Sequence, residues 1–172
     1  TKKNEDPLIQ KPTGYSQINM MQKVSFKLTK HLKFGYGFHY SETSNYGRYD
    51  RLIRTKNGFP RSGRWDYGPQ IWMMNNLAIE YNITNVFFDQ MRITLAQQYF
   101  KESRIDRNFN KNIESTNTEK VFAYSINTDF IKKIKERHQI VYGLEFVNDV
   151  VHSFGEKKDI STDEITVGPS RY

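Results

Sequence analysis

The chain has 172 residues and a mean hydropathy of −0.77. A membrane-spanning helix needs an apolar run of about 18 residues or more, and the sequence contains none, so such helices are excluded. The absence of cysteine excludes disulfides and thiolate metal sites. The 26 basic and 19 acidic residues leave a net charge of +7, which favours an anionic partner. The polar first residues lack the apolar segment of a signal peptide, as in a mature chain or an internal fragment.

Six segments alternate apolar and polar residues with a period of two, the pattern of strands with one apolar face. In chain order they are residues 17–28, 33–40, 70–82, 91–100, 121–130 and 140–149. Their lengths are close to the roughly 9–11 residues that a tilted transmembrane strand needs. Two stretches have an alternative, because 91–102 has fair helix propensity and 130–134 could instead begin a short amphipathic helix.

The two sides of these segments differ in charge. Of the 30 positions on the apolar side, four are polar (Gln22, Asn75, Gln97 and Thr128) and none is charged. The opposite side carries Lys23, Lys27, His39, Glu80, Arg92, Asp129, Glu145 and Asp149. This segregation predicts one face toward an apolar medium and one toward water.

The connections are expected to alternate in length. Short turns are predicted at 29–33, 83–90 and 131–139, and long polar loops at 41–69, 101–120 and 150–172. Short turns at one end and long loops at the other are typical of outer-membrane barrels, with periplasmic turns and extracellular loops. We therefore expect an all-β fold: three hairpins, or about six strands, of an antiparallel up-and-down transmembrane β-barrel.

Six strands are too few to close such a barrel, which starts at about eight, so the chain is expected to form part of a larger one. The remaining strands would come from missing sequence or from other subunits, and missing sequence is favoured because bacterial barrels are mostly single chains. The alternatives are a soluble, basic β-domain that binds an anionic ligand, built as a sandwich or half-open barrel with a dry core, and a passive porin-like barrel.

The loop 41–69 interleaves arginines with aromatic residues. Guanidinium groups bind carboxylates and phosphates and stack on aromatic rings. A ferric chelate, a haem propionate or lipopolysaccharide phosphates would suit the loop, with these candidate ligand-binding residues: Arg48, Arg51, Arg54, Arg61, Arg64, Trp65 and Tyr67. The alternative is a solvated loop whose arginines pair with Asp50 and Asp66. Nucleic acid is not expected, because the remaining charge alternates along strands instead of forming one basic face.

Four stretches carry a family resemblance: RYDRL (48–52), WDYGPQIWMM (65–74), ESRIDRNFN (102–110) and TEKV (118–121). Their order and the hairpins around them, from about Gln17 to Tyr172, resemble the TonB-dependent outer-membrane receptors, especially Bacteroidetes-type receptors for haem or ferric siderophores. The resemblance implies a 22-stranded barrel with a plugged lumen that imports an iron complex with energy relayed through TonB.

No plug domain or TonB box is visible, so residues 1–172 are expected to be part of the barrel domain of such a receptor, in the bacterial outer membrane. The implied partners are outer-membrane lipid and lipopolysaccharide, the iron chelate or haem as substrate, and TonB, contacted through an N-terminal region that this chain lacks.

His39, expected on the lumen side, is a candidate haem ligand or an ordinary polar lining residue. The other three histidines are dispersed, which argues against a zinc site. No nucleophile elbow, phosphate-binding loop or zinc-protease motif occurs, so we expect no enzyme, no metal site and no cofactor of the chain's own.

Overall fold

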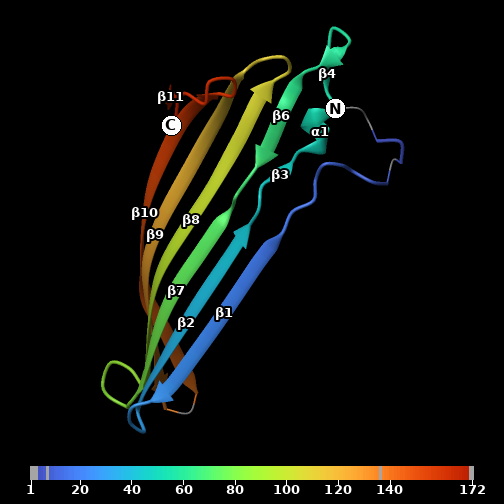
Figure 1. Cartoon of the computed structure of the whole chain (residues 1–172). Helices are drawn as coiled ribbons and strands as arrows, with labels where there is room; N and C mark the ends of the chain where they lie inside the picture. Colours follow the sequence, from blue (N-terminus) through green and yellow to red (C-terminus); the bar gives the residue numbers. More distant parts are fainter. Residues whose placement is uncertain (1–3, 7, 136, 171–172) are drawn as a thin grey trace.

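Long antiparallel strands dominate the structure, a computed structural model that describes residues 4–6, 8–135 and 137–170 (Figure 1). Each long strand pairs with the next one along the chain, so they form a meander. The six strands are β1 (Gln17–Lys27), β2 (Leu32–Thr43), β7 (Ile71–Asn82), β8 (Gln90–Asn108), β9 (Ile113–Ile134) and β10 (His138–Asp159). The fold is therefore all-β, as predicted, and each predicted strand overlaps one of the six.

Short elements complete the structure: β3 (Tyr46–Gly47), α1 (Tyr49–Leu52), β4 (Thr55–Lys56), β5 (Phe59–Pro60), β6 (Ser62–Tyr67) and β11 (Ile165–Gly168). The nine-stranded sheet has the order β1-β2-β7-β8-β9-β10-β11, with β6 paired to β8 and β3 to β6. β4 and β5 form a separate hairpin. Its turn is Asn57-Gly58, and both residues have the positive φ (52° and 79°) that a tight two-residue hairpin requires.

β8 has a different neighbour in each half. Residues 90–101 pair with β7, and residues 104–108 pair with β6. At the junction Gly68 has φ +99°, and a Cβ there would lie 2.9 Å from the carbonyl oxygen of Ser44. Glycine thus lets the chain leave β6 and enter β7 within three residues.

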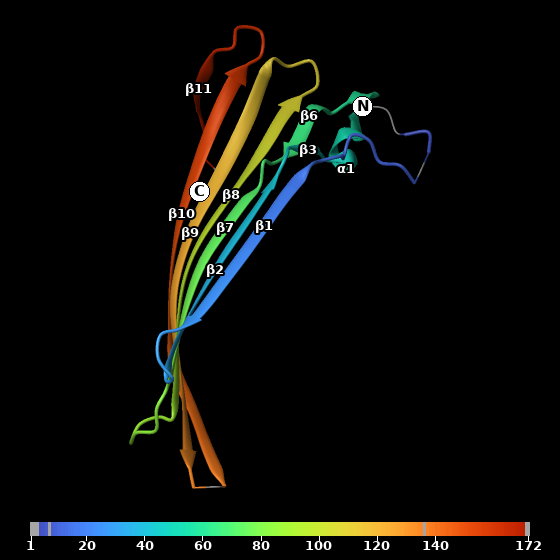
Figure 2. The same cartoon turned by 60° about the horizontal axis from the view of Figure 1, so that its bottom comes forward.

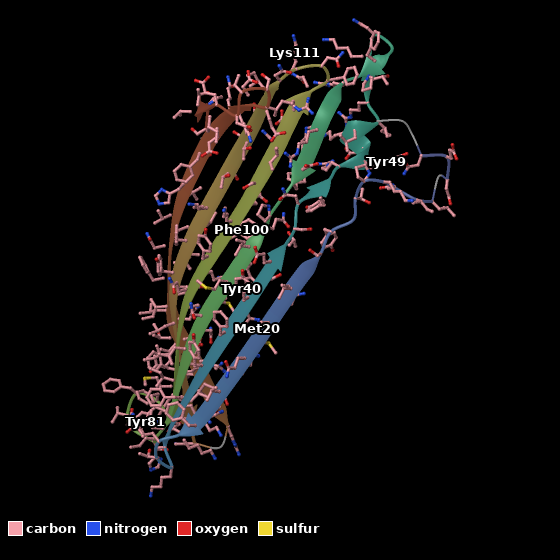
Figure 3. All side chains as sticks on the ribbon, in the orientation of Figure 1. Met20, Tyr40, Tyr49, Tyr81, Phe100 and Lys111 are labelled. Carbon is pink, nitrogen blue, oxygen red and sulfur yellow. The ribbon has the colours of Figure 1, made fainter. Side chains whose placement is uncertain are left out.

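The pairing registers place every predicted apolar set on one side of the sheet. Met20 pairs with Tyr40, Tyr40 with Met73, Met73 with Tyr99, and Tyr99 with Phe122. Because directly paired residues share a face, these side chains lie in one row across five strands. We call this side the apolar face and the other the polar face; the predicted segregation is confirmed. Figure 3 labels Met20, Tyr40 and Tyr81 of the apolar face and Phe100 of the polar face.

The helical alternatives at 91–102 and 130–134 are not realised, since both stretches lie within strands. We call one end of the sheet the turn end, where strands connect through 28–31, 83–89 and 135–137. The loop end carries the connections 44–70, 109–112 and 160–164. The three short turns and the long loop after β2 were predicted correctly, except that the third turn is shorter than expected.

The two other long loops were predicted wrongly. β8 and β9 continue to a four-residue turn at 109–112, and β10 runs to Asp159 before β11 returns alongside it. The reason is that backbone pairing, which needs no apolar side chains, carries these strands beyond the point where the apolar alternation stops. Figure 2 shows the resulting long hairpins.

The sheet forms a single curved layer (Figures 1 and 2). Among the described residues the buried apolar side chains are Leu52 and Ile105, and no large side chain is fully buried. The two-layer dry core of a sandwich is thus absent from this part of the chain. Within the part of the chain that the structure describes, β1 and β11 each pair on one side only, so the sheet is open at both edges and is not closed into a barrel. Within the described ranges no helix has the length and apolar character to cross a membrane.

Candidate functional site

The connection 44–70 folds against the loop end of the sheet. Leu52, only 4% exposed, anchors the single turn of α1, which contacts β6. β6 is in turn held by its backbone pairing with β8. The arginine-rich loop therefore has a defined structure attached to a rigid strand, which is a requirement for a specific binding surface.

Three guanidinium groups gather around one indole ring. The Cζ atoms of Arg48, Arg51 and Arg104 lie 5.2, 5.3 and 5.9 Å from the centre of the Trp65 ring. Arg48 also lies 5.5 Å from the Tyr67 ring, which meets Trp65 edge-on at 5.0 Å. We call these five residues the arginine cluster. Its stacking contacts hold the guanidinium planes in fixed positions.

Arg104 is the member that the sequence analysis did not include. It comes from β8, and it joins the cluster because it pairs directly with Tyr67 of β6. The residue lies in a stretch that was predicted to be a loop, so only the strand register identifies it.

Asp50 neutralises part of the cluster. Its carboxylate accepts two hydrogen bonds of 2.8 Å from Arg48, and guanidinium nitrogens of Arg51 and Arg54 lie 3.8 Å away. The hydrogen bonds from Arg48 hold the pKa of Asp50 below its usual value, and the same contact raises the pKa of Arg48. The pairing of loop arginines with Asp50, one of the predicted alternatives, is confirmed.

Positive charge nevertheless remains. Arg104 lies 3.7 Å from Asp106, so four arginines face two carboxylates and leave an excess of two charges. The buried Nε atoms of Arg51 and Arg104 have no hydrogen-bond acceptor among the described residues. The excess positive charge of the cluster suits an anionic ligand such as a carboxylate or a phosphate.

A groove of about 610 Å³ lies beside the arginine cluster. Arg48, Tyr67 and Tyr46 line one side, and Gln10 and Thr13 of the N-terminal segment line another. The backbone N–H of Asn4 donates to the hydroxyl of Tyr49, which also lines the groove and is labelled in Figure 3. The groove is large enough for a small-molecule ligand.

The remaining predicted arginines lie elsewhere. Arg54 is at the edge of the cluster and donates to the carbonyl oxygen of Asp50 at 3.2 Å. Arg61 lines a separate depression of about 600 Å³ between the β4–β5 hairpin and the 109–112 turn, near Lys111 (Figure 3).

Arg64 of β6 lies on the same side of the sheet as the apolar face. It pairs with Arg107 of β8, and Arg107 lies on that side because it pairs with Glu114 of β9. It forms ion pairs with Asp66 at 2.6 Å and with Glu114 at 2.8 Å. The predicted pairing of a loop arginine with Asp66 is thus confirmed. Of the seven predicted loop residues, the structure brings together Arg48, Arg51, Trp65 and Tyr67, with Arg54 at their edge.

His39 lies on the polar face, as expected for that position. It pairs with Met74, and its ring lies 5.8 Å from the Trp72 ring. Across the described residues, no group of three or more His, Cys, Asp or Glu side chains could hold a metal ion. Haem ligation by His39 stays a prediction from the sequence.

The apolar face leaves many large hydrophobic side chains uncovered. Leu144 is 80% exposed and Phe146 is 64% exposed, and each long strand except β7, whose apolar side chains are half-buried, contributes exposed apolar side chains to this face. Soluble monomers rarely expose apolar patches of more than a few hundred Å².

Some polar side chains on the apolar face form hydrogen bonds with one another. The Tyr36 hydroxyl donates to Asn75 at 2.6 Å, and the amide of Asn75 donates to Gln97 at 3.2 Å. Such pairing lowers the free-energy cost of placing amides in an apolar medium.

None of the protein-family models and none of the curated proteins compared with this chain matches it.

Proposed function

We propose that this chain forms part of the wall of a transmembrane β-barrel in a bacterial outer membrane, in a receptor that imports an iron complex with energy from TonB. The observation that carries the membrane assignment is the apolar face. Between the charged residues that bound it, this face is uncharged on six adjacent strands, and its apolar side chains are exposed on five of them and half-buried on β7. A water-soluble sheet would cover such a face with a second layer.

The height of the uncharged surface fits a bilayer. On β9 the apolar face is bounded by Lys120 and Lys132, which are 12 residues apart. At a rise of about 3.3 Å per residue the span is roughly 40 Å along the strand. With the tilt of about 40° usual in membrane barrels, it becomes roughly 30 Å, the thickness of the hydrocarbon core.

The polar face supports a water-filled or plugged interior. Its ionised residues form cross-strand pairs, such as Lys33 with Glu80 at 3.4 Å and Arg92 with Glu80 at 3.7 Å. Interior faces of large membrane barrels are polar in this way, whereas the lipid side is not.

The open edges require further strands under this proposal. Unpaired backbone N–H and C=O groups on β1, and on the part of β10 that β11 does not cover, could not face lipid. Additional strands of a longer protein would pair with them, up to the 22 that the family resemblance implies.

The turn 83–89 suggests how the turn end meets the membrane surface. Val86 and Phe87 are 86% and 74% exposed. The Tyr142 hydroxyl donates to the Phe87 carbonyl at 2.9 Å, and Lys132 lies 3.1 Å from Asp89, so the turn is held on the side of the apolar face. Exposed apolar and aromatic groups at this level match the interfacial girdle of membrane barrels.

The arginine cluster is the proposed contact for the substrate. It lies on the polar face beyond the uncharged span, at the loop end, where a ligand outside the cell would arrive. Its excess positive charge favours a carboxylate-bearing ferric chelate or the propionates of haem. Catalysis is not proposed.

Cysteine variants test the membrane assignment directly, because the natural chain contains no cysteine. Phe146 and Val147 are neighbours on β10 with opposite faces and similar exposure, 64% and 50%. In the protein reconstituted in liposomes, a fluorophore at Phe146→Cys should be quenched by brominated lipid, and one at Val147→Cys by aqueous iodide. Equal iodide quenching at both positions would point instead to the soluble β-domain.

Growth on different iron sources tests the transport assignment. Deleting the gene should abolish growth on one of ferric citrate, a ferric siderophore or haemin as the sole iron source, and a plasmid copy should restore it. Restored uptake that persists without TonB would favour the passive porin-like barrel.

A further inference from the structure

Two lysines and a histidine lie in one row at the loop end of the apolar face. Lys101 of β8 pairs directly with Lys120 of β9, and Lys120 pairs directly with His152 of β10. We call these residues the basic row. The like charges of Lys101 and Lys120, directly opposite on neighbouring strands, repel each other, and a bound anion would offset that repulsion.

No carboxylate among the described residues pairs directly with the basic row; the acid in the same row, Glu42 of β2, is separated from Lys101 by Ile71 of β7. No described carboxylate lies within 4 Å of the Lys101 or Lys120 amine. On this face of β8, β9 and β10 the acids are Glu114 and Glu156, six residues from Lys120 and four from His152. Glu114 is already bound to Arg64.

The basic row borders the uncharged surface. One step toward the turn end, the same strands carry Tyr99, Phe122 and Val150. The Lys120 amine lies 5.2 Å from the Phe154 ring, on the side away from the uncharged surface. If lipid covers the apolar face, the row is at the level of the lipid headgroups.

We propose that the basic row binds the phosphate groups of an outer-leaflet lipid whose acyl chains cover the apolar face next to it. The inference rests on the proposed membrane function, and it assigns a lipid-binding site on the outside of the barrel, distinct from the arginine cluster on the polar face. Lipid is the favoured occupant because the row is continuous with a surface that itself needs lipid to cover it.

The test uses the complete protein in detergent, with the double variant Lys101→Gln and Lys120→Gln. Diphosphorylated lipid A and its phosphate-free form serve as probes, and native mass spectrometry measures the bound lipid. Two lysines near an anionic surface contribute about fivefold each, so removing both should weaken lipid A binding roughly 25-fold.

A matched double variant is Lys23→Gln and Lys157→Gln. These lysines lie on the polar face, on β1 and β10, and form no ion pair among the described residues. Their removal should leave lipid A binding unchanged, although the change in net charge is the same.

The outcomes separate the two proposals. Equal binding of lipid A to the parent and to the Lys101/Lys120 variant, or equal binding of the phosphate-free lipid, would overturn the lipid site and leave the barrel proposal standing. A parent protein that shows no heat-modifiable migration in detergent would overturn both.

Discussion

The half of the sheet near the turn end (the apolar half) differs in chemistry from the half near the loop end with its connection 44–70 (the loop half), although the backbone ladder of β8 and β9 runs through both. Near the turn end, pairs such as Met91 with Phe130 and Leu95 with Ile126 make the outward side apolar. Beyond Lys101 the same ladder continues through Ser103 with Thr118 to Arg107 with Glu114. Backbone hydrogen bonding therefore extends the strands through both halves, whereas the character of the side chains differs between them.

The largest effect should come from placing a charge in the apolar half. Under the membrane proposal, Leu144→Arg should cost about 2–4 kcal/mol, the value for arginine on the lipid side near the midplane. Val147→Arg, three residues along β10 on the polar face, should cost far less. Urea titration of the protein folded into liposomes measures both. An unchanged free energy of unfolding for Leu144→Arg would contradict the proposed difference between the two halves.

The loop half should depend on conventional burial instead. Leu52→Ala should destabilise the connection 44–70 by about 2 kcal/mol, the low end of the range for a buried leucine, because the segment lies at the surface. Hydrogen exchange of α1 and β6 amides should accelerate, while exchange in β9 stays as it was. Leu8→Ala, at a leucine that is 91% exposed, is the control. Faster exchange over the whole sheet would contradict the separation of the two halves.

Within the loop half, position relative to Trp65 should decide the effect on ligand binding. Arg104→Gln should weaken binding of ferric citrate or haemin about tenfold, since one charge-assisted hydrogen bond is lost. Arg61→Gln removes the same charge from the separate depression and should have little effect. Fluorescence titration of the tryptophans provides the dissociation constants. Equal losses in both variants would indicate a general electrostatic effect and no specific cluster.

The smallest effect should be the pH dependence of the loop. The pKa of Asp50 is lowered in the folded state by its hydrogen bonds from Arg48, so its stabilising contribution is present above its unfolded-state pKa and is lost as the pH falls through the folded value. Exchange of the α1 amides should be steady from neutral pH down to about 5 and should rise below about 4, after correction for intrinsic rates. Asp50→Asn should remove this dependence; an unchanged profile in that variant would assign it to another group.

The sequence predicted the apolar half well and the loop half poorly for a physical reason. In residues 122–130 every second side chain is uncharged and mostly apolar, so the period of two is visible directly. In residues 101–108 and 113–120 both sides are polar, and strand pairing leaves no trace in hydropathy.

The candidate site shows the same limit. Arg48, Arg51, Trp65 and Tyr67 could be selected because they are close in sequence and chemically suited to an anion. Arg104 and Glu114 could not, since their proximity to the loop depends on the register of β6, β8 and β9.

The free edge of β1 restricts whatever strand lies next to it. Side chains alternate along Gln17–Lys27, so a neighbour must present its own apolar residues in phase with Met20 and Val24. If the pairing of that neighbour with β1 shifted by one residue, its polar side chains would lie on the apolar face. A shift by two residues would keep its apolar and polar side chains on their own faces. Any candidate neighbour can therefore be tested by whether its apolar residues fall at every second position in phase with those of β1, before its exact alignment is known.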